Sequence, residues 1–151
     1  MKFYFLRQHS LLYLIQLQDD LGRVEEAKFS PTSIAEKRNT HQQSKAGQTN
    51  GIKDGLSNDQ GGHLNGAQNG GAGEQINYLP QDALLNNGPY KSLETLWNKA
   101  ASEGKKVEVT VKPIYEGSSK RASEFRVEYT IDGGEVIPER FLNTPTPKKG
   151  Q

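Results

Sequence analysis

A single histidine, His63, lies in a stretch made almost wholly of Gly, Asn and Gln, DQGGHLNGAQNGGAGEQINYLPQD over residues 59–82. An unperturbed imidazole has a pKa of about 6.5, so a useful fraction of it is neutral near working pH and able to accept a proton. The chemistry open to this residue is therefore general acid–base catalysis. The alternative is a solvated loop histidine that does no chemistry, and the segments after the stretch distinguish the two.

The composition of the region by itself favours a linker. Nine of the chain's 16 glycines fall between Gly47 and Gly73, and such segments bury too little apolar surface to offset the entropy lost on ordering. Hydrophobic residues make up 32% of the 151 residues, and they gather near the N-terminus and from Leu79 onward. This distribution allows one modest core with a polar middle and a polar tail.

The elements before and within the glycine-rich region are short. Residues 11–17 predict a strand, the sequence DDLG at residues 19–22 predicts a turn, and residues 23–29 predict a return strand, which together form a hairpin. The polar residues 31–58 contain a short helix, expected around residues 33–38. Residues 76–79 predict a further short strand that Pro80 ends.

The segment NNGPYKSLETLWNKAASEG at residues 86–104 predicts a helix. Asn87 or Gly88 can cap it, Pro89 suits its first position and Gly104 stops it. Its core-facing side at helical spacing consists of Tyr90, Leu93, Leu96, Trp97 and Ala100.

Alternating apolar residues then predict an antiparallel meander. The sequence IDGGE at residues 131–135 turns the chain, and a last strand begins at Val136 and Ile137. The class is α+β, since no βαβ units alternate. The alternating positions are Val107, Val109 and Val111, followed by Phe125, Val127, Tyr129 and Ile131.

A histidine near the end of one β element, then a second strand, then a helix that offers a metal ligand is the ββα-metal arrangement. Here the pieces are GGHL (residues 61–64), GGAGEQINYLPQD (residues 70–82) and LLNNGPYKSLETLW (residues 84–97). They resemble the DNA/RNA non-specific endonuclease family, most closely its bacterial toxin branch, found at the C-termini of large secreted or contact-dependent proteins. The resemblance covers about residues 11–137.

The resemblance is specific because order and spacing must agree. Gly-His is followed by Asn-x-x-Pro-Gln and then by Asn-x-Gly, with a glutamate eight residues after that asparagine. It implies that His63 is the general base and that Asn86 binds Mg²⁺ or another divalent ion such as Mn²⁺. Glu94 would act near the metal through bound water, and Asn77 would belong to the catalytic set. Gly62 and Gln81 would shape the site.

Each of these roles has a plain structural alternative. Asn86 or Asn87 could be only a helix N-cap, and Glu94 could be an exposed helix carboxylate. Asn77 and Gln81 could be ordinary turn-forming polar residues. His9 and His41 fit no part of the motif, so surface roles are expected for them.

The chain departs from the family pattern beside His63. Many members have Asp-Arg-Gly-His where this chain has Gln-Gly-Gly-His, which leaves open the cation that neutralises the transition-state phosphate. Asn65, Gly66 and Asn69 stand where more apolar residues are typical, which predicts weaker packing behind the histidine. The candidate phosphate contacts are Lys37, Arg38, Lys120 and Arg121.

Composition excludes several classes. The absence of cysteine excludes disulfide scaffolds, thiol nucleophiles and Cys-ligated zinc. The net charge of +1 does not indicate a globally basic nucleic-acid binder. Charge is uneven, with five basic and two acidic residues in 28–54 and two basic and five acidic in 57–103. This pattern could mark a cation site between polyanion-binding flanks, or chance variation in solvated segments.

The expected organisation is one nuclease domain over residues 1–142, with its core motif at 59–103 and a flexible tail at 143–151. The start MKFYFLRQHSLLYLIQLQ lacks a cleavage site and the length of a membrane span. The chain is therefore either cytosolic or one domain of a longer secreted protein. The toxin resemblance favours the second, with delivery from the producing bacterium and action in the target-cell cytoplasm.

The leading hypothesis is a metal-dependent, sequence-nonspecific endonuclease, delivered as an antibacterial toxin and neutralised by an immunity protein. DNA is the favoured substrate and RNA the alternative, because phosphate contacts look alike for both. The free protein is expected to be a monomer. The competing hypotheses are a catalytically decayed domain that only binds nucleic acid or a partner protein, and a small α+β domain with a disordered middle and no site.

Overall fold

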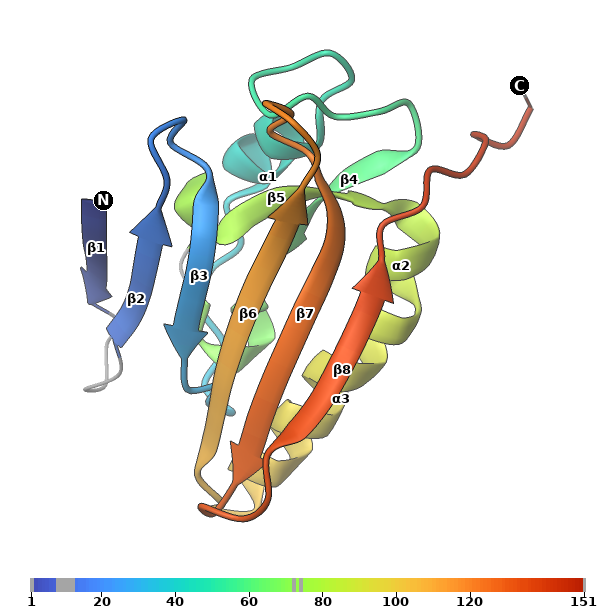
Figure 1. The fold of residues 1–151 in the computed structure, drawn as a ribbon. Helices are drawn as coiled ribbons and strands as arrows, with labels where there is room; N and C mark the ends of the chain where they lie inside the picture. The colour runs from blue at the N-terminus through green and yellow to red at the C-terminus, as the bar shows by residue number, and fades with distance from the viewer. Residues whose placement is uncertain (1, 8–12, 72, 74, 151) are drawn as a thin grey trace.

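The main feature of the fold is an antiparallel sheet of six strands in the order β1-β2-β3-β6-β7-β8 (Figure 1). A computed structural model describes residues 2–7, 13–71, 73 and 75–150. The strands of this sheet are β1 (Lys2–Arg7), β2 (Tyr13–Gln18), β3 (Val24–Phe29), β6 (Val107–Tyr115), β7 (Ala122–Ile131) and β8 (Ile137–Leu142).

A second, smaller layer lies beside the sheet, and helix α3 covers one sheet face (Figure 1). The smaller layer contains a two-stranded antiparallel ribbon, β4–β5, which is followed directly by two helices. The chain therefore has the ββα order and the expected α+β class. The elements are α1 (Thr40–Gly47), β4 (Asp59–His63), the 3₁₀ turns η1 (Ala67–Asn69) and η2 (Gln75–Asn77), β5 (Tyr78–Asp82), α2 (Ala83–Asn87) and α3 (Pro89–Ser102).

The core lies between α3 and the sheet. Successive strand residues face opposite sides of a sheet, and the buried valines of β6 alternate with exposed charged residues as expected. Trp97 is fully buried at the centre of the core. Its ring lies 6.0 Å from that of Phe29, 6.5 Å from that of Tyr90 and 5.8 Å from that of Tyr129. These edge-on aromatic contacts fix α3 against β3 and β7.

Helix α3 begins and ends as the sequence predicts. Pro89 occupies the first turn, Gly88 is the N-cap, and Gly104 follows the helix with a φ of 79°. The prediction is wrong for one core residue, because Leu96 is 43% exposed, whereas Leu93 is 7% exposed. None of the helices in the described part of the chain is long and apolar enough to cross a membrane.

The N-terminal hairpin and the C-terminal meander form one sheet, a pairing for which no prediction was made. Strand β3 pairs antiparallel with β6, with Ala27 opposite Val111. Pairing between segments so distant in sequence leaves no local signal. Strand β1 was not predicted, and residues 11 and 12 of the expected strand at 11–17 lie outside the described residues.

Two local expectations in the middle of the chain are wrong. The helix forms at Thr40–Gly47 rather than at residues 33–38, because Asn39 caps it: its Oδ1 accepts a hydrogen bond from Gln42 N at 3.2 Å. Strand β5 does not end at Pro80 but runs through it to Asp82. Each strand of a two-stranded ribbon has one edge free of the partner strand, which tolerates a proline.

The glycine-rich region is ordered where it is described, contrary to the linker expectation. A Cβ on Gly61 would lie 1.9 Å from Gln43 O, and one on Gly47 would lie 2.3 Å from Gly61 N. Helix α1 and strand β4 thus pack backbone against backbone, which only glycine permits. The glycines serve close packing here, because the contact needs their missing side chains rather than their flexibility.

The segment after β8 is anchored, so the expected free tail from residue 143 is wrong for its first residues. Asn143 is 1% exposed and donates hydrogen bonds to Pro80 O at 3.0 Å and Ala122 O at 2.7 Å. Thr146 Oγ1 donates to the carboxylate of Asp82. The folded domain therefore extends at least to Thr146.

Candidate active site

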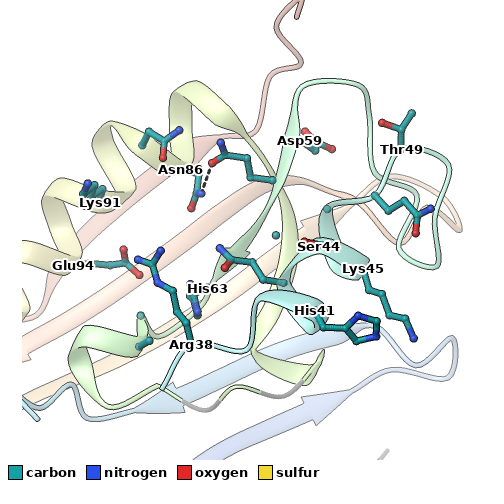
Figure 2. A pocket seen from close by; sticks show the side chains of 18 of the residues that line it. Arg38, His41, Ser44, Lys45, Thr49, Asp59, His63, Asn86, Lys91 and Glu94 are labelled. Carbon is teal, nitrogen blue, oxygen red and sulfur yellow. Dashed lines mark hydrogen bonds between the residues drawn. The ribbon is translucent and has the colours of Figure 1, made fainter. Parts of the chain in front are cut away.

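The ββα unit brings three of the predicted residues to one cavity of about 960 Å³ (Figure 2). His63 is the last residue of β4, Asn86 lies in the short helix α2, and Glu94 lies in the second turn of α3. All three line the cavity, together with Arg38 from the segment before α1. Because α2 and α3 follow β5 directly, the ribbon fixes all of these side chains relative to one another.

His63 is buried, with 8% of its surface exposed, and its ring lies 4.5 Å from that of Tyr78 on the paired strand. Burial, together with the nearby charge of Arg38, lowers the pKa of His63 from 6.5 to about 4. The imidazole is therefore neutral at pH 7. Its Nε2 has no hydrogen-bond partner among the described residues. Nε2 is itself shielded from solvent. The neutral imidazole keeps one ring nitrogen without a hydrogen, which is what a proton acceptor requires.

Asn77 clamps the loop that follows His63. Its backbone oxygen accepts from Leu64 N at 2.9 Å, its Oδ1 accepts from Asn65 N at 3.0 Å, and its Nδ2 donates to Asn65 O at 2.8 Å. Tyr90 Oη adds a bond to Leu64 O at 2.9 Å. Asn77 is fully buried and is not part of the cavity wall. In place of the expected catalytic role, its contacts are those of a residue that positions His63.

The unusual residues after His63 lie close to Glu94. Asn69 is fully buried, and its Nδ2 donates to Glu94 O at 3.0 Å. A Cβ on Gly66 would lie 2.9 Å from Glu94 Oε1, so a larger residue there would displace the end of that side chain. Asn65 is 1% exposed and its backbone is bonded to Asn77 as described. Both polar atoms of the Asn65 side chain, and Asn69 Oδ1, are buried without a hydrogen-bond partner among the described residues, and the expected weaker packing behind His63 stays a prediction.

Glu94 is not an ordinary exposed helix carboxylate. Burial raises the pKa of Glu94 from 4.5 to about 8, against the opposing effects of Arg38 and Lys91. Figure 2 shows Arg38 close to both Glu94 and His63. A half-buried carboxyl group whose pKa lies this far from its usual range is typical of a functional site.

Gly62 and Gln81 form the floor of the ribbon beside His63. A Cβ on Gly62 would lie 2.5 Å from Gln81 Oε1 across the ribbon, so the fully buried Gln81 fits only against a glycine. Neither residue lies on the cavity wall. The site-shaping role expected of them stays a prediction.

Asn86 presents its carbonyl oxygen to the cavity with no hydrogen bond from the described residues. Its Nδ2 donates to Gln60 Oε1 at 2.7 Å, shown as the dashed line in Figure 2. Neither Asn86 nor Asn87 caps α3, because the N-cap is Gly88 and no side chain bonds to it. Asn87 also lines the cavity, but its side chain makes no hydrogen bond with the described residues.

Among the four candidate phosphate contacts, the structure brings only Arg38 to the cavity. Arg121 is 9% exposed and pairs with Asp59 through two bonds of 2.7 and 2.9 Å. Lys120 lines a different cavity of about 530 Å³, and Lys37 is exposed but lies off the wall. Lys120 and Arg121 are therefore wrong as contacts at this site.

Four basic residues on the cavity wall were missed: His41, Lys45, Lys91 and Lys148. Lys91 had a local signal, because it precedes Glu94 by three residues on α3 and so shares its helix face. Lys148 had no signal, since the tail was expected to be free. His41 was expected at an unrelated surface position, and His9 lies outside the described residues.

The residues present suit a hard divalent ion held by few protein ligands. In the described ranges no group of three His, Cys, Asp or Glu residues could hold a metal ion. Mg²⁺ retains most of its waters and needs only one or two protein oxygens plus substrate phosphate. The free Oδ1 of Asn86 and the carboxylate of Glu94 across the same cavity fit that requirement.

Comparison with known proteins gives a family match and a set of relatives. The profile of the DNA/RNA non-specific endonuclease family matches residues 9–133. The chain is 33% identical over 132 residues to the type VII secretion system protein EssD of Staphylococcus aureus, in strains USA300 and NCTC 8325. That alignment covers 83% of this chain and 21% of EssD, so the chain spans about a fifth of these relatives' length.

Solved nuclease structures share the fold. NucA from Streptococcus agalactiae, solved with a magnesium ion bound, has a TM-score of 0.61 at 16% identity, over 95% of this chain and 85% of NucA. The Sda1 nuclease, solved with a bound zinc ion, has the same TM-score at 16% identity, over 95% of this chain and 74% of Sda1. At this identity the likeness establishes the ββα-metal fold.

The buried, neutral His63 makes stability depend on pH. Its pKa is about 4 in the native state and about 6.5 in an unfolded chain, so between these values only the unfolded chain takes up the proton. The free energy of unfolding should therefore fall by on the order of 3 kcal/mol as pH drops from 6.5 to 4. Urea unfolding at several pH values should show a smaller decline for His63→Gln. Parallel curves for the two proteins would contradict a buried neutral imidazole.

Proposed function

The chain belongs to the DNA/RNA non-specific endonuclease family, and on that premise we propose that it is a metal-dependent endonuclease without sequence preference. It hydrolyses phosphodiester bonds, with DNA as the favoured substrate. One observation carries the proposal: the buried, neutral His63 shares a cavity wall with Asn86 and Glu94. The wall thus combines a base, an oxygen ligand and a carboxylate, which phosphodiester hydrolysis requires.

His63 acts as the general base. The ring nitrogen that carries no hydrogen takes the proton of the attacking water, and burial beside Arg38 keeps the imidazole unprotonated until that step. The clamp of Asn77 on Leu64 and Asn65 fixes the loop that starts at His63, so the ring orientation is set before substrate binds. Asn77 is in this sense a positioning residue.

Asn86 and Glu94 form the metal site. A bound Mg²⁺ or Mn²⁺ supplies a Lewis acid that offsets charge on the scissile phosphate and the leaving oxygen. Asn86 would hold the ion through Oδ1, which the bond from its Nδ2 to Gln60 keeps facing the cavity. Glu94 would act through water, and its carboxylate would ionise more readily beside a cation.

Arg38 takes the place of the arginine that many family members carry before Gly-His. Its charge acts on both His63 and Glu94, so it lies at the centre of the site rather than at its edge. A guanidinium binds a phosphate through two parallel hydrogen bonds. In this position Arg38 stabilises the phosphate in the transition state. It also favours the neutral form of the base.

The remaining cations of the wall fit a long polyanion. Lys45 and Lys91 lie on the same cavity as Arg38 and form no salt bridge with the described residues. Such contacts bind phosphates without reading bases, which suits a substrate of any sequence. These phosphate contacts alone do not distinguish DNA from RNA.

We further propose an antibacterial role with a protein inhibitor. The relatives named EssD are type VII secretion system proteins, and the chain spans only part of their length. The chain therefore suits a nuclease domain exported within a larger protein, to act in the cytoplasm of a target cell. A nuclease without sequence preference endangers its producer, so an immunity protein is needed. Arg38, Lys45 and Lys91 favour an acidic inhibitor that covers the cavity.

Replacing His63 with Ala tests the proposed chemistry. Cleavage of plasmid DNA and of total RNA should occur with Mg²⁺ and stop with EDTA. Loss of the proton acceptor should lower the rate by about 10²–10⁴-fold, while circular dichroism and thermal unfolding remain those of a folded protein. A folded variant with near-normal cleavage would make the mechanism wrong. A wild-type protein that binds but does not cleave would favour the decayed-domain hypothesis.

Asn86 and Asn87 form a matched pair for the metal site. Asn86→Ala should lower activity by about 10- to 100-fold, as expected for a lost metal contact, and raising Mg²⁺ should recover part of it. Asn87→Ala should change little, because Asn87 shares the cavity but its side chain has no hydrogen bond. Mg²⁺ titrations of cleavage rate measure both. The opposite result would assign the ligand to Asn87.

Expression in a bacterial host tests the antibacterial role. The wild-type chain produced alone in the cytoplasm should arrest growth and degrade nucleic acid, whereas His63→Ala should not. Co-expression of the small gene immediately downstream should restore growth, and the purified inhibitor should bind more weakly as salt rises. If active wild-type protein accumulates without harm to the host, both the proposed toxin role and the proposed immunity protein are contradicted.

A further inference from the structure

We propose that residues 143–148 form a fixed strap that holds Lys148 on the cavity wall, where it binds a substrate phosphate away from the scissile bond. The inference rests on the proposed nuclease function and deepens it by adding a substrate-binding residue. Lys148 lines the same cavity as His63, Asn86 and Arg38, although it lies far from them in sequence.

The strap is first fixed at Asn143. This side chain is buried and uses all of its hydrogen-bonding groups: Nδ2 donates to Pro80 O and Ala122 O, and Oδ1 accepts from Asp82 N at 2.9 Å. The backbone oxygen of Asn143 accepts from Arg121 Nη1 at 2.8 Å. The chain therefore leaves β8 in one direction, across the back of the catalytic ribbon.

The second fixed point is Thr146. Its backbone N–H donates to Asp82 Oδ2 at 2.8 Å, and its hydroxyl donates to the same carboxylate at 2.7 and 2.9 Å. The hydroxyl oxygen accepts from Asn58 Nδ2 at 2.6 Å. Asp82 is 2% exposed and is also the N-cap of α2, where it accepts from Leu84 N. Thr146 is thus tied to the start of the helix that carries Asn86.

The second anchor decides where Lys148 can go. An extended chain spans at most about 3.6 Å per residue, so the backbone of Lys148 lies within about 7 Å of Thr146. If Asn143 were the only anchor, the same lysine could range over about 18 Å. The Thr146 anchor therefore confines the charge to the cavity rim and reduces the ordering entropy lost when substrate binds.

The charge of Lys148 is free to meet a phosphate. Its side chain is exposed and forms no salt bridge with the described residues, and it completes a rim with Arg38, Lys45 and Lys91. Lys149 is an internal control, because it has the same side chain one residue later and does not line the cavity. Thr144 is a second control, since it is exposed and its side chain has no hydrogen bond.

The first experiment measures affinity for a fluorescein-labelled 30-base-pair DNA duplex by anisotropy, with Mg²⁺, in the His63→Ala background. Loss of one phosphate contact should lower the slope of log affinity against log salt by about 0.9. If the variant and the reference protein bind equally at 1 M salt, this difference in slope makes the variant's DNA affinity about eightfold weaker at 0.1 M salt. Lys148→Ala should show both effects, and Lys149→Ala neither.

The second experiment tests the strap with a double-mutant cycle. Thr146→Val removes the hydroxyl at nearly constant volume and should weaken DNA binding several-fold, whereas Thr144→Val should not. In the Lys148→Ala background, Thr146→Val should have no further effect on affinity, since its role is to place that lysine. In proteins that retain His63, Lys148→Ala and Thr146→Val should each raise KM for plasmid DNA and leave kcat unchanged.

The outcomes separate this inference from the proposed function. If Lys148→Ala and Lys149→Ala bind DNA with equal affinity, whether normal or weakened, the proposed role of the strap is wrong. A phosphate contact specific to Lys148 requires that only Lys148→Ala weakens DNA binding. A Thr146→Val effect that persists without Lys148, or a lower kcat, would assign Thr146 to the stability of α2 and also overturn the proposed role of the strap. If wild-type protein neither cleaves nor binds DNA, the nuclease function itself fails.

Discussion

The site depends on the clamp between Asn77 and the two residues after His63. A buried loop must satisfy its backbone N–H and C=O groups, and one asparagine side chain satisfies both for Asn65. The clamp determines where β4 ends and therefore where the His63 ring lies. It also directs the loop toward α3, where Gly66 and Asn69 meet Glu94. The base and the carboxylate are thus positioned by the same short segment.

Close backbone contacts make an ordered site possible in so polar a region. Gly47 and Gly61 let α1 pack directly on β4, and Gly62 leaves room for the buried Gln81. Side chains that bury little apolar surface cannot order a loop by the hydrophobic effect alone. Here the ordering comes from hydrogen bonds and from docking on a rigid partner, the sheet with α3 and Trp97 at its core.

Electrostatics gives His63 and Glu94, two of the ionisable groups on the cavity wall, different protonation states. Burial lowers the pKa of His63 and raises that of Glu94, while Arg38 acts on both. A neutral base and a carboxyl group ready to ionise beside a cation are the two states that metal-assisted hydrolysis uses. Asp59 also lines the cavity, but its buried carboxylate is paired with Arg121.

The sequence determined the elements with strong local patterns and the identity of the chemical groups. Pro89 and Gly104 predicted the bounds of α3, alternation predicted β6 and β7, and the resemblance to the endonuclease family implied roles for His63, Asn86 and Glu94. Only the tertiary structure decided that β3 pairs with β6, that Arg121 is buried with Asp59, and that Lys148 reaches the cavity. These depend on contacts between residues distant in sequence, which leave no periodicity or cap to detect. For the same reason the glycine-rich segment was misjudged, because a close-packed glycine and a flexible one look identical until the neighbouring backbone is known.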